Sequence, residues 1–305
     1  MKIAVLGAGA MGSVFGARLA RAGQDVTLID VRRDTVEAVN AGGLQLKNSS
    51  GEIESISLRA TTEPRDVGPV DLIMVFVKCY HTHAAVCGAL PLIASNTAIL
   101  TLQNGWGNIA RIAEIIDQKR VLAGVTYHSA TLLGPGHVHH AGQGMTIMGE
   151  LDGRMSGRLS RIVDAFQSAG LEVTPTAGVV QAIWSKLALN VCTLPTSALL
   201  RFYAGRLGEH AGTIDLMREL LRETVGVANR QNIPLDYDER WEAITGMLKR
   251  AGEAKSSMFQ DIENRRRTEI DAVNGAVVEA GRRLDFPTPY NEAMFWLVRS
   301  LEETF

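Results

Sequence analysis

Cysteine is scarce in this chain of 305 residues, which carries only Cys79, Cys87 and Cys192. No two of them form a CxxC pair, so the sequence predicts neither a disulfide framework nor a cysteine zinc site. Such sparse use of cysteine is typical of a reducing compartment. We therefore expect a cytoplasmic protein.

An excess of charge of one sign is also missing. The 31 Lys and Arg residues nearly balance the 33 Asp and Glu residues, for a formal net charge of −2, so no global field attracts nucleic acid or an anionic membrane. No apolar stretch reaches the roughly 18 residues of a membrane span, and the start, MKIAVLGAGAMG, lacks the layout of a signal peptide. We expect neither nucleic acid nor a membrane as a partner.

The composition is that of a globular chain, with 46% hydrophobic and 21% charged residues, and its length suits two domains. In the first half, short apolar runs alternate with helical patterns. This predicts an α/β Rossmann domain over residues 1–176, with a doubly wound, mostly parallel sheet. We expect a helix at 10–22 and strands at 2–6, 25–29, 71–78, 98–102, 120–130 and 145–149.

The second half has helical patterns and hardly any strand signal, which predicts an all-α domain over residues 177–305. Its first helix, 178–200, contains Pro195 and is expected to bend there. Further helices are expected at 213–229, at 240–251, from 261 onward and at 289–304.

A glycine fingerprint, GxGxxG, directly follows the first predicted strand and opens the first helix. In a dinucleotide-binding fold the first glycine allows the tight turn, the second lets a pyrophosphate approach, and the third lets helix and strand pack closely. The helix N-terminus offers N–H groups to the phosphates. The predicted cofactor loop consists of Gly7, Ala8, Gly9, Ala10, Met11 and Gly12.

The end of the second predicted strand bears on the choice of cofactor. A carboxylate at Asp30 can accept both ribose hydroxyls of NAD and would repel a 2′-phosphate. Arg32 and Arg33 argue for NADPH, because guanidinium groups bind phosphate well, unless they form a solvated face. The residues favour NADH slightly and leave NADPH open.

Two polar residues stand at predicted strand ends, where ligands bind in open α/β sheets. Lys78 ends a strongly apolar strand and could reach a cofactor ribose or a substrate anion. Asn104 ends the next strand within Gln103-Asn104-Gly105. A plain Asn-Gly turn explains Asn104 equally well.

Histidines cluster in the first half without a convincing ligand set. In a strand, His137 and His139 would share a face and could form a metal pair. No third ligand is evident, so we expect these residues, with His140, His81 and His83, to be surface histidines, and we predict no metal.

Candidate acid–base chemistry lies in the second half. Lys186 and Asn190 are four residues apart on a predicted helix and share a face with apolar neighbours. Loss of hydration there lowers the pKa of a lysine toward a proton-donating range. The alternative is a lysine that extends its ammonium to water.

Ser257 and Glu269 bracket a segment with two apparent helix starts. Ser257 with Gln260 fits a capping box, a role that needs no ligand. On one straight helix Ser257 and Glu269 would stand about 18 Å apart, at about 1.5 Å per residue. Both can serve one small substrate only if the helix breaks between Asn264 and Thr268.

Taken together, these motifs resemble the ketopantoate reductases (2-dehydropantoate 2-reductases). The matching pieces run in the family's order over nearly the whole chain. They are GAGAMG at 7–12, VFVK ending at Lys78, QNG at 103–105, WSKLALN at 184–190, SSMFQDIE at 256–263, and RTEID–VNG from Arg267 to Gly275.

The resemblance implies hydride transfer from NADPH or NADH to the C2 carbonyl of a 2-keto acid, in a cleft between a Rossmann and a helical domain. It implies that Lys186 donates the proton and that Glu269 positions this lysine or the cofactor's nicotinamide end. Substrate-binding residues would be Asn104, Asn190 and Ser257, and Lys78, Asn104 and Ala130 would line the reactive half of the cofactor.

Three departures from the family pattern concern specificity. Asparagines common in the family are replaced here by Leu194 and Ala254, and the arginine that binds the 2′-phosphate falls at Val31. Because an apolar site does not select for a hydroxyl, one hypothesis is a D-2-hydroxyacid dehydrogenase acting on a more apolar 2-keto acid. A second alternative is a dinucleotide-binding sensor without activity. The oligomeric state stays open, with a homodimer as one option.

Overall fold

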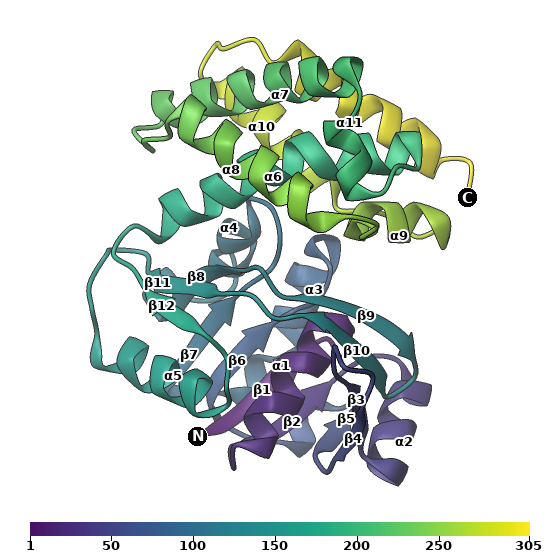
Figure 1. Cartoon of the computed structure of the whole chain (residues 1–305). Coiled ribbons are helices and arrows are strands. Elements are labelled where there is room, and N and C mark those ends of the chain that lie inside the picture. The colour runs from purple at the N-terminus through teal and green to yellow at the C-terminus, as the bar shows by residue number, and fades with distance from the viewer. The chain divides into compact units, whose positions relative to one another are not determined.

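The computed structural model describes residues 1–305, and its contacts divide them into two compact units. The first unit comprises Met1–Gln103 and Asn108–Val179, and the second comprises Asn104–Gly107 and Val180–Phe305. The first contains both sheets and the second is helical (Figure 1), which confirms the predicted fold class. No helix is both long and apolar enough to cross a membrane.

An eight-stranded sheet, in the order β12-β11-β8-β7-β6-β1-β2-β5, forms the centre of the first unit. Every pairing is parallel except that of β11 with β8. The strands are β1 (Lys2–Leu6), β2 (Asp25–Ile29), β5 (Arg59–Thr61), β6 (Val70–Val75), β7 (Ile93–Thr101), β8 (Val121–Thr126), β11 (Thr146–Glu150) and β12 (Val173–Pro175).

Helices and apolar side chains cover both faces of this sheet, as a mostly parallel sheet requires. Successive residues of β1 alternate between two cores: Ile3 joins the core that contains Phe15, whereas Ala4 joins the core that contains Ile112. The helices of this unit are α1 (Ala10–Arg21), α2 (Arg33–Gly42), α3 (Thr82–Gly88), α4 (Asn108–Ala113) and α5 (Gly157–Ser168).

A second sheet of four strands, in the order β4-β3-β10-β9, was not predicted. It consists of β3 (Leu44–Lys47), β4 (Ile53–Ile56), β9 (Ser129–Gly134) and β10 (His137–Gly142), and all four of its strands contact α1. The prediction of one strand at 120–130 was therefore wrong. The chain changes sheets after Thr126, so that Ala130 lies in β9 opposite His140.

The prediction that His140 lies on the surface was also wrong. Alternate residues of β10 face inward, and His140 is only 2% exposed. Its Nε2 lies 2.9 Å from His128 Nδ1, and its Nδ1 lies 3.3 Å from a guanidinium nitrogen of Arg18. Burial lowers the pKa of both histidines to about 4, so both are neutral at neutral pH. No group of three or more metal-ligating side chains occurs.

The second unit packs its helices around an apolar core. Trp184, Leu187 and Val191 line the inner face of α6, and Leu220 and Val277 meet them from α7 and α10. The predicted helix from 261 onward is two helices, with a 3-10 turn at Ile270–Ala272 between them. The helices are α6 (Val179–Leu200), α7 (Ala211–Arg230), α8 (Tyr237–Ala251), α9 (Ser257–Glu263), α10 (Asn274–Arg283) and α11 (Pro289–Glu302).

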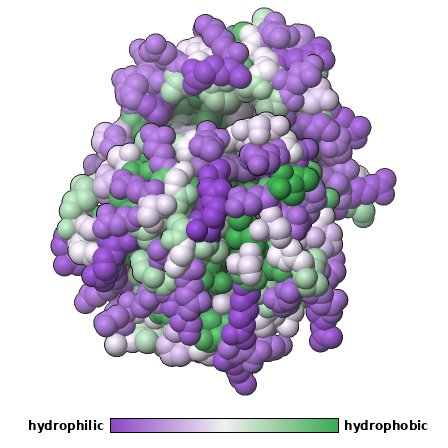
Figure 2. Space-filling model, turned by 60° about the horizontal axis from the view of Figure 1, so that its bottom comes forward, coloured by the Kyte–Doolittle hydropathy of each residue, from purple (hydrophilic) through white to green (hydrophobic).

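The outer surface is predominantly polar. Figure 2 shows one face, where hydrophilic side chains predominate and hydrophobic ones appear in smaller areas between them. Scattered apolar residues of this kind are ordinary for a folded chain.

Candidate functional site

The glycine fingerprint forms the turn between β1 and α1. Gly7 has a φ of +97°, which few other residues adopt. A Cβ on Gly12 would lie 1.9 Å from the carbonyl oxygen of Gly7, so helix and turn can approach this closely only without a side chain. A Cβ on Gly9 would meet nothing within 4 Å, so open space lies beside this residue.

The loop fits the phosphates of a dinucleotide. Gly9 is the N-cap of α1. Because glycine has no side chain, the N-cap residue leaves the first turn of the helix uncovered. The orphan N–H groups of a first helical turn and its partial positive charge attract anions. Ala8, Ala10 and Met11 complete the loop, and the last two are partly exposed.

Asp30 is held next to this loop at the end of β2. One carboxylate oxygen accepts the N–H of Ala8 at 2.7 Å, and the other accepts the N–H of Arg32 at 2.9 Å. The carboxylate is thus oriented by two backbone donors. The guanidinium of Arg32 is paired with Asp34 at 2.7 Å, and Val31 is 92% exposed.

Lys78 lies beyond the end of its strand, contrary to the prediction. β6 ends at Val75 because its partner β1 turns away at Gly7, and the N–H of Phe76 makes the last bond to Leu6. Lys78 instead precedes the 3-10 turn Cys79–His81. It remains at the carboxyl edge of the sheet, the side on which α/β sheets bind ligands.

Gln103, which the sequence singled out only as the first residue of the QNG motif, connects two segments at this edge of the sheet. Its side-chain amide donates to the carbonyl of Val77 at 2.6 Å and to the hydroxyl of Thr82 at 2.8 Å. The QNG motif was the available signal, and it drew attention to Asn104 alone.

In the second unit, Lys186 and Asn104 are brought together. Lys186 Nζ donates to Asn104 Oδ1 at 2.7 Å, although the two residues are 82 positions apart. Burial lowers the pKa of Lys186 to about 8, and the negative charge of Glu269 partly opposes this shift. An ammonium of this kind is a competent acid near neutral pH.

The turn that carries Asn104 is seated on the segment after Glu269. Trp106 donates its N–H to the carbonyl of Ala272 at 2.8 Å. Gly105 has a φ of +83°, and a Cβ there would lie 2.3 Å from the same carbonyl oxygen. Asn104 is therefore both part of an Asn-Gly turn and a site residue, because this turn directs its side chain to Lys186.

Glu269 is buried, with 9% of its surface exposed, at the start of the turn Ile270–Ala272. The break that the sequence required between Asn264 and Thr268 is present, because α9 ends at Glu263. The segment is anchored from α11, where Glu302 accepts the backbone N–H of Thr268 at 2.7 Å.

Asn190 lies one helical turn after Lys186 and is 6% exposed. Its Nδ2 is buried without a hydrogen-bond partner, which is costly for a polar group unless a ligand supplies an acceptor. Leu194 follows one turn later and is partly buried against apolar neighbours. The face of α6 thus changes from polar to apolar along its length.

Ser257 is not placed as a capping residue, so that prediction was wrong. Ser256 caps α9, and its hydroxyl accepts the N–H of Phe259 at 3.1 Å. Ser257 is the first helical residue and is exposed, as is Ala254. The structure joins Lys186, Asn104 and the charge of Glu269, but it does not join Ser257 to them by a hydrogen bond.

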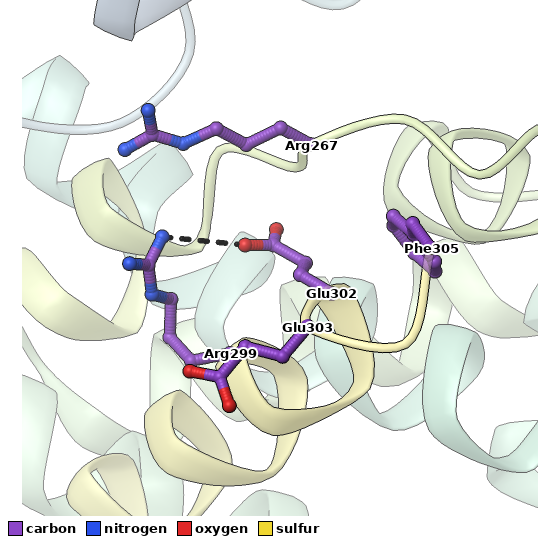
Figure 3. Close-up of a pocket in the computed structure, with 5 residues that line it drawn as sticks. All are labelled: Arg267, Arg299, Glu302, Glu303 and Phe305. Atoms are coloured by element: carbon purple, nitrogen blue, oxygen red, sulfur yellow. Dashed lines mark hydrogen bonds and ion pairs between the residues drawn. The ribbon is translucent and has the colours of Figure 1, made fainter.

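A separate cavity of about 270 Å³ lies at the end of α11 (Figure 3). Glu302 pairs there with Arg299, while Arg267 pairs with Asp271. Because both arginines are already paired with carboxylates, the cavity offers no unpaired positive charge for a keto acid. Its lining residues are Arg267, Arg299, Glu302, Glu303 and Phe305.

A dinucleotide loop in one unit and a partly buried lysine–amide pair in the other define a nicotinamide-dependent oxidoreductase. The comparisons specify which one. The family described as ketopantoate reductase PanE/ApbA matches residues 3–153, and its C-terminal counterpart matches residues 179–302. The chain belongs to the ketopantoate reductase family.

Individual relatives are similar to this chain over nearly its full length. The 2-dehydropantoate 2-reductase of Halobacterium salinarum is 33% identical over 98% of this chain and 98% of its own. The structure of a PanE/ApbA family ketopantoate reductase from Ralstonia eutropha JMP134 has 33% identity and a TM-score of 0.92, covering 100% of this chain and 99% of that one. D-mandelate dehydrogenase with NADH and anilino(oxo)acetate has 28% identity and a TM-score of 0.95, with the same coverage.

Proposed function

We propose that this protein reduces a 2-keto acid to a 2-hydroxy acid, with 2-dehydropantoate (ketopantoate) as the first candidate substrate. The observation that carries the proposal is the buried ammonium of Lys186, which is held by Asn104 at 2.7 Å and has a pKa of about 8. A bound nicotinamide supplies the hydride that the C2 carbonyl accepts.

The residues of the second unit then stabilise the charge on the carbonyl oxygen and supply its proton. The ammonium of Lys186 stabilises negative charge as it develops on the carbonyl oxygen and donates the proton to it. Asn104 orients the ammonium, and Glu269 keeps it protonated by raising its pKa. The unpartnered amide of Asn190 donates to a substrate oxygen. Ser257 remains a proposed substrate-binding residue, on the strength of the family resemblance alone.

A second candidate substrate is a 2-keto acid with a more apolar side chain. Leu194 supports it, since this side chain continues the face of α6 beyond Asn190 and offers no hydrogen bond. The structural similarity to D-mandelate dehydrogenase, which is named for an aromatic 2-hydroxy acid, points the same way. A site that pairs a hydroxyl rejects analogues without it, whereas an apolar site does not.

For the cofactor we propose NADH. Asp30 presents a carboxylate fixed by two backbone N–H groups, where a 2′-phosphate would be repelled. Arg32 is already engaged by Asp34, and Val31 offers no positive charge. Gly7 to Gly12 would hold the pyrophosphate, and Lys78 and Ala130 remain proposed neighbours of the cofactor's reactive half.

The two parts of the chain divide this work in the proposal: residues 1–176 hold the dinucleotide and residues 177–305 the keto acid. The location is proposed to be cytoplasmic, consistent with three cysteines that form no disulfide. A homodimer is proposed as the assembly. Light scattering after size-exclusion chromatography tests it, and a mass near 33.0 kDa would show a monomer instead.

The deciding experiment is a steady-state assay of NADH and NADPH oxidation with ketopantoate, 2-ketoisovalerate and phenylglyoxylate. Turnover with ketopantoate at the highest kcat/KM supports the first candidate, and a preference for either of the other two acids supports the second. Cofactor binding without turnover on any acid would contradict the enzymatic proposal and favour a dinucleotide sensor.

A further inference from the structure

Helix α6 contains a proline just beyond its proposed substrate-binding face. Pro195 has no N–H, so the carbonyl of Val191, four residues earlier, loses its helical donor. A buried carbonyl without a donor is costly. In this structure, Asn274 Nδ2 donates to the Val191 carbonyl at 3.2 Å. Asn274 therefore replaces, from outside the helix, the bond that Pro195 removes.

Asn274 is itself held rigidly. It is fully buried, and its Nδ2 also donates to Asn291 Oδ1 at 3.0 Å. Two carbonyl acceptors on the same nitrogen determine which way the amide points. Asn291 in turn donates to the buried carboxylate of Glu223 at 2.8 Å. The chain of bonds joins α6, α10, α11 and α7.

The bond to Val191 lies directly beside the proposed substrate contact. Val191 follows Asn190, whose own Nδ2 has no partner and therefore no bond that sets its direction. The backbone of α6 at this point decides where the Asn190 amide points. Asn274 also comes two residues after Ala272, the residue on which the turn of Asn104 is seated.

We infer that Asn274 is a positioning residue for keto acid binding. It holds the backbone of α6 at Val191 and thereby directs Asn190. The inference rests on the proposed reductase function. Wild-type turnover with the keto acid panel is the reference measurement, so an inactive wild type contradicts the function, whereas an active wild type with unaffected variants contradicts the positioning role alone.

The test compares Asn274→Leu, which keeps the bulk and removes the donor, with the wild-type holoenzyme. The expected result is a rise in KM for the keto acid of about 10- to 100-fold, the scale of a displacement of about 1 Å in a site. The dissociation constant of NADH should stay within about twofold, because the dinucleotide loop lies in the other unit.

A matched control separates positioning from stability. Thr213 is also buried in the helical unit, and its hydroxyl donates to the Leu207 carbonyl at 2.6 Å. Thr213→Val should lower the midpoint of thermal unfolding and leave KM unchanged. If Asn274→Leu behaves in the same way, with a lower midpoint and an unchanged KM, Asn274 is structural only and the inference is wrong.

A second variant keeps the test decisive if Asn274→Leu does not fold. Pro195→Ala returns an N–H to the helix without removing any buried hydrogen bond. The Val191 carbonyl can then accept this N–H in place of the Asn274 amide, so KM for the keto acid should rise while the unfolding midpoint does not fall. An unchanged KM in Pro195→Ala would overturn the proposed link between the Asn274–Val191 bond and substrate binding.

Discussion

At the residue scale, the proposed chemistry depends on the protonation of Lys186. Burial lowers its pKa to about 8, and Glu269 opposes the shift. Ketone reduction needs the ammonium form, so kcat/KM should fall as pH rises through about 8. Oxidation of the 2-hydroxy acid needs the neutral amine and should instead rise through the same pH.

Replacing Glu269 should move this pH profile. In Glu269→Gln the negative charge that raises the pKa of Lys186 is lost, so that pKa falls and the descending limb of reduction shifts to lower pH. Steady-state rates from pH 5 to 10 measure the shift. Glu263→Gln is the control, since this exposed residue pairs with Lys255. An unmoved limb in Glu269→Gln would show that its charge does not act on Lys186.

The proposed choice of NADH also depends on single side chains. Asp34→Asn should release Arg32 from its ion pair and improve kcat/KM for NADPH by about tenfold, since a hydrogen bond to a charged group contributes about 1.5–3 kcal/mol. Asp30→Ser should raise the NADPH to NADH ratio further by removing the repelling carboxylate. Steady-state kinetics with both cofactors check this. If the NADPH to NADH ratio of kcat/KM is unchanged in both variants, the proposal for NADH is wrong.

At the scale of elements, the turn between β7 and α4 carries Asn104 to Lys186. Gly105→Ala would place a Cβ 2.3 Å from the Ala272 carbonyl, so the turn must move. We expect kcat to fall about 10- to 100-fold as Asn104 leaves the ammonium. Gly23→Ala is the control, because Gly23 has a similar φ of +85° but open space around it. Equal kcat in the two variants would contradict the assigned role of the turn.

At the scale of the whole molecule, the proposed function assigns cofactor binding and proton transfer to different units. Lys186→Ala should lower turnover by about two to four orders of magnitude through loss of the general acid. Its affinity for NADH, measured by fluorescence titration, should stay close to that of wild type because the glycine loop is in the first unit. Loss of NADH binding in Lys186→Ala would show that the two functions are not separable.

Local patterns were enough to predict much of the fold. β1 and β2 have the predicted bounds, and α6 begins within one residue of the prediction. Their signals come from neighbours in sequence: apolar runs between glycines for the strands, and helical periodicity for α6. The second sheet was missed because its strands carry weak burial patterns: β4 has one buried residue, and β9 has none to mark an inner face.

The sequence by itself determined the glycine loop, the division into α/β and helical parts, and the shared face of Lys186 and Asn190. Each of these depends on residues within one turn or one helix. Only the tertiary structure decided that Asn104 meets Lys186 from 82 positions away, that Asn274 satisfies Val191, and that His140 is buried. Such pairings depend on how separate elements pack, and no spacing along the chain encodes them.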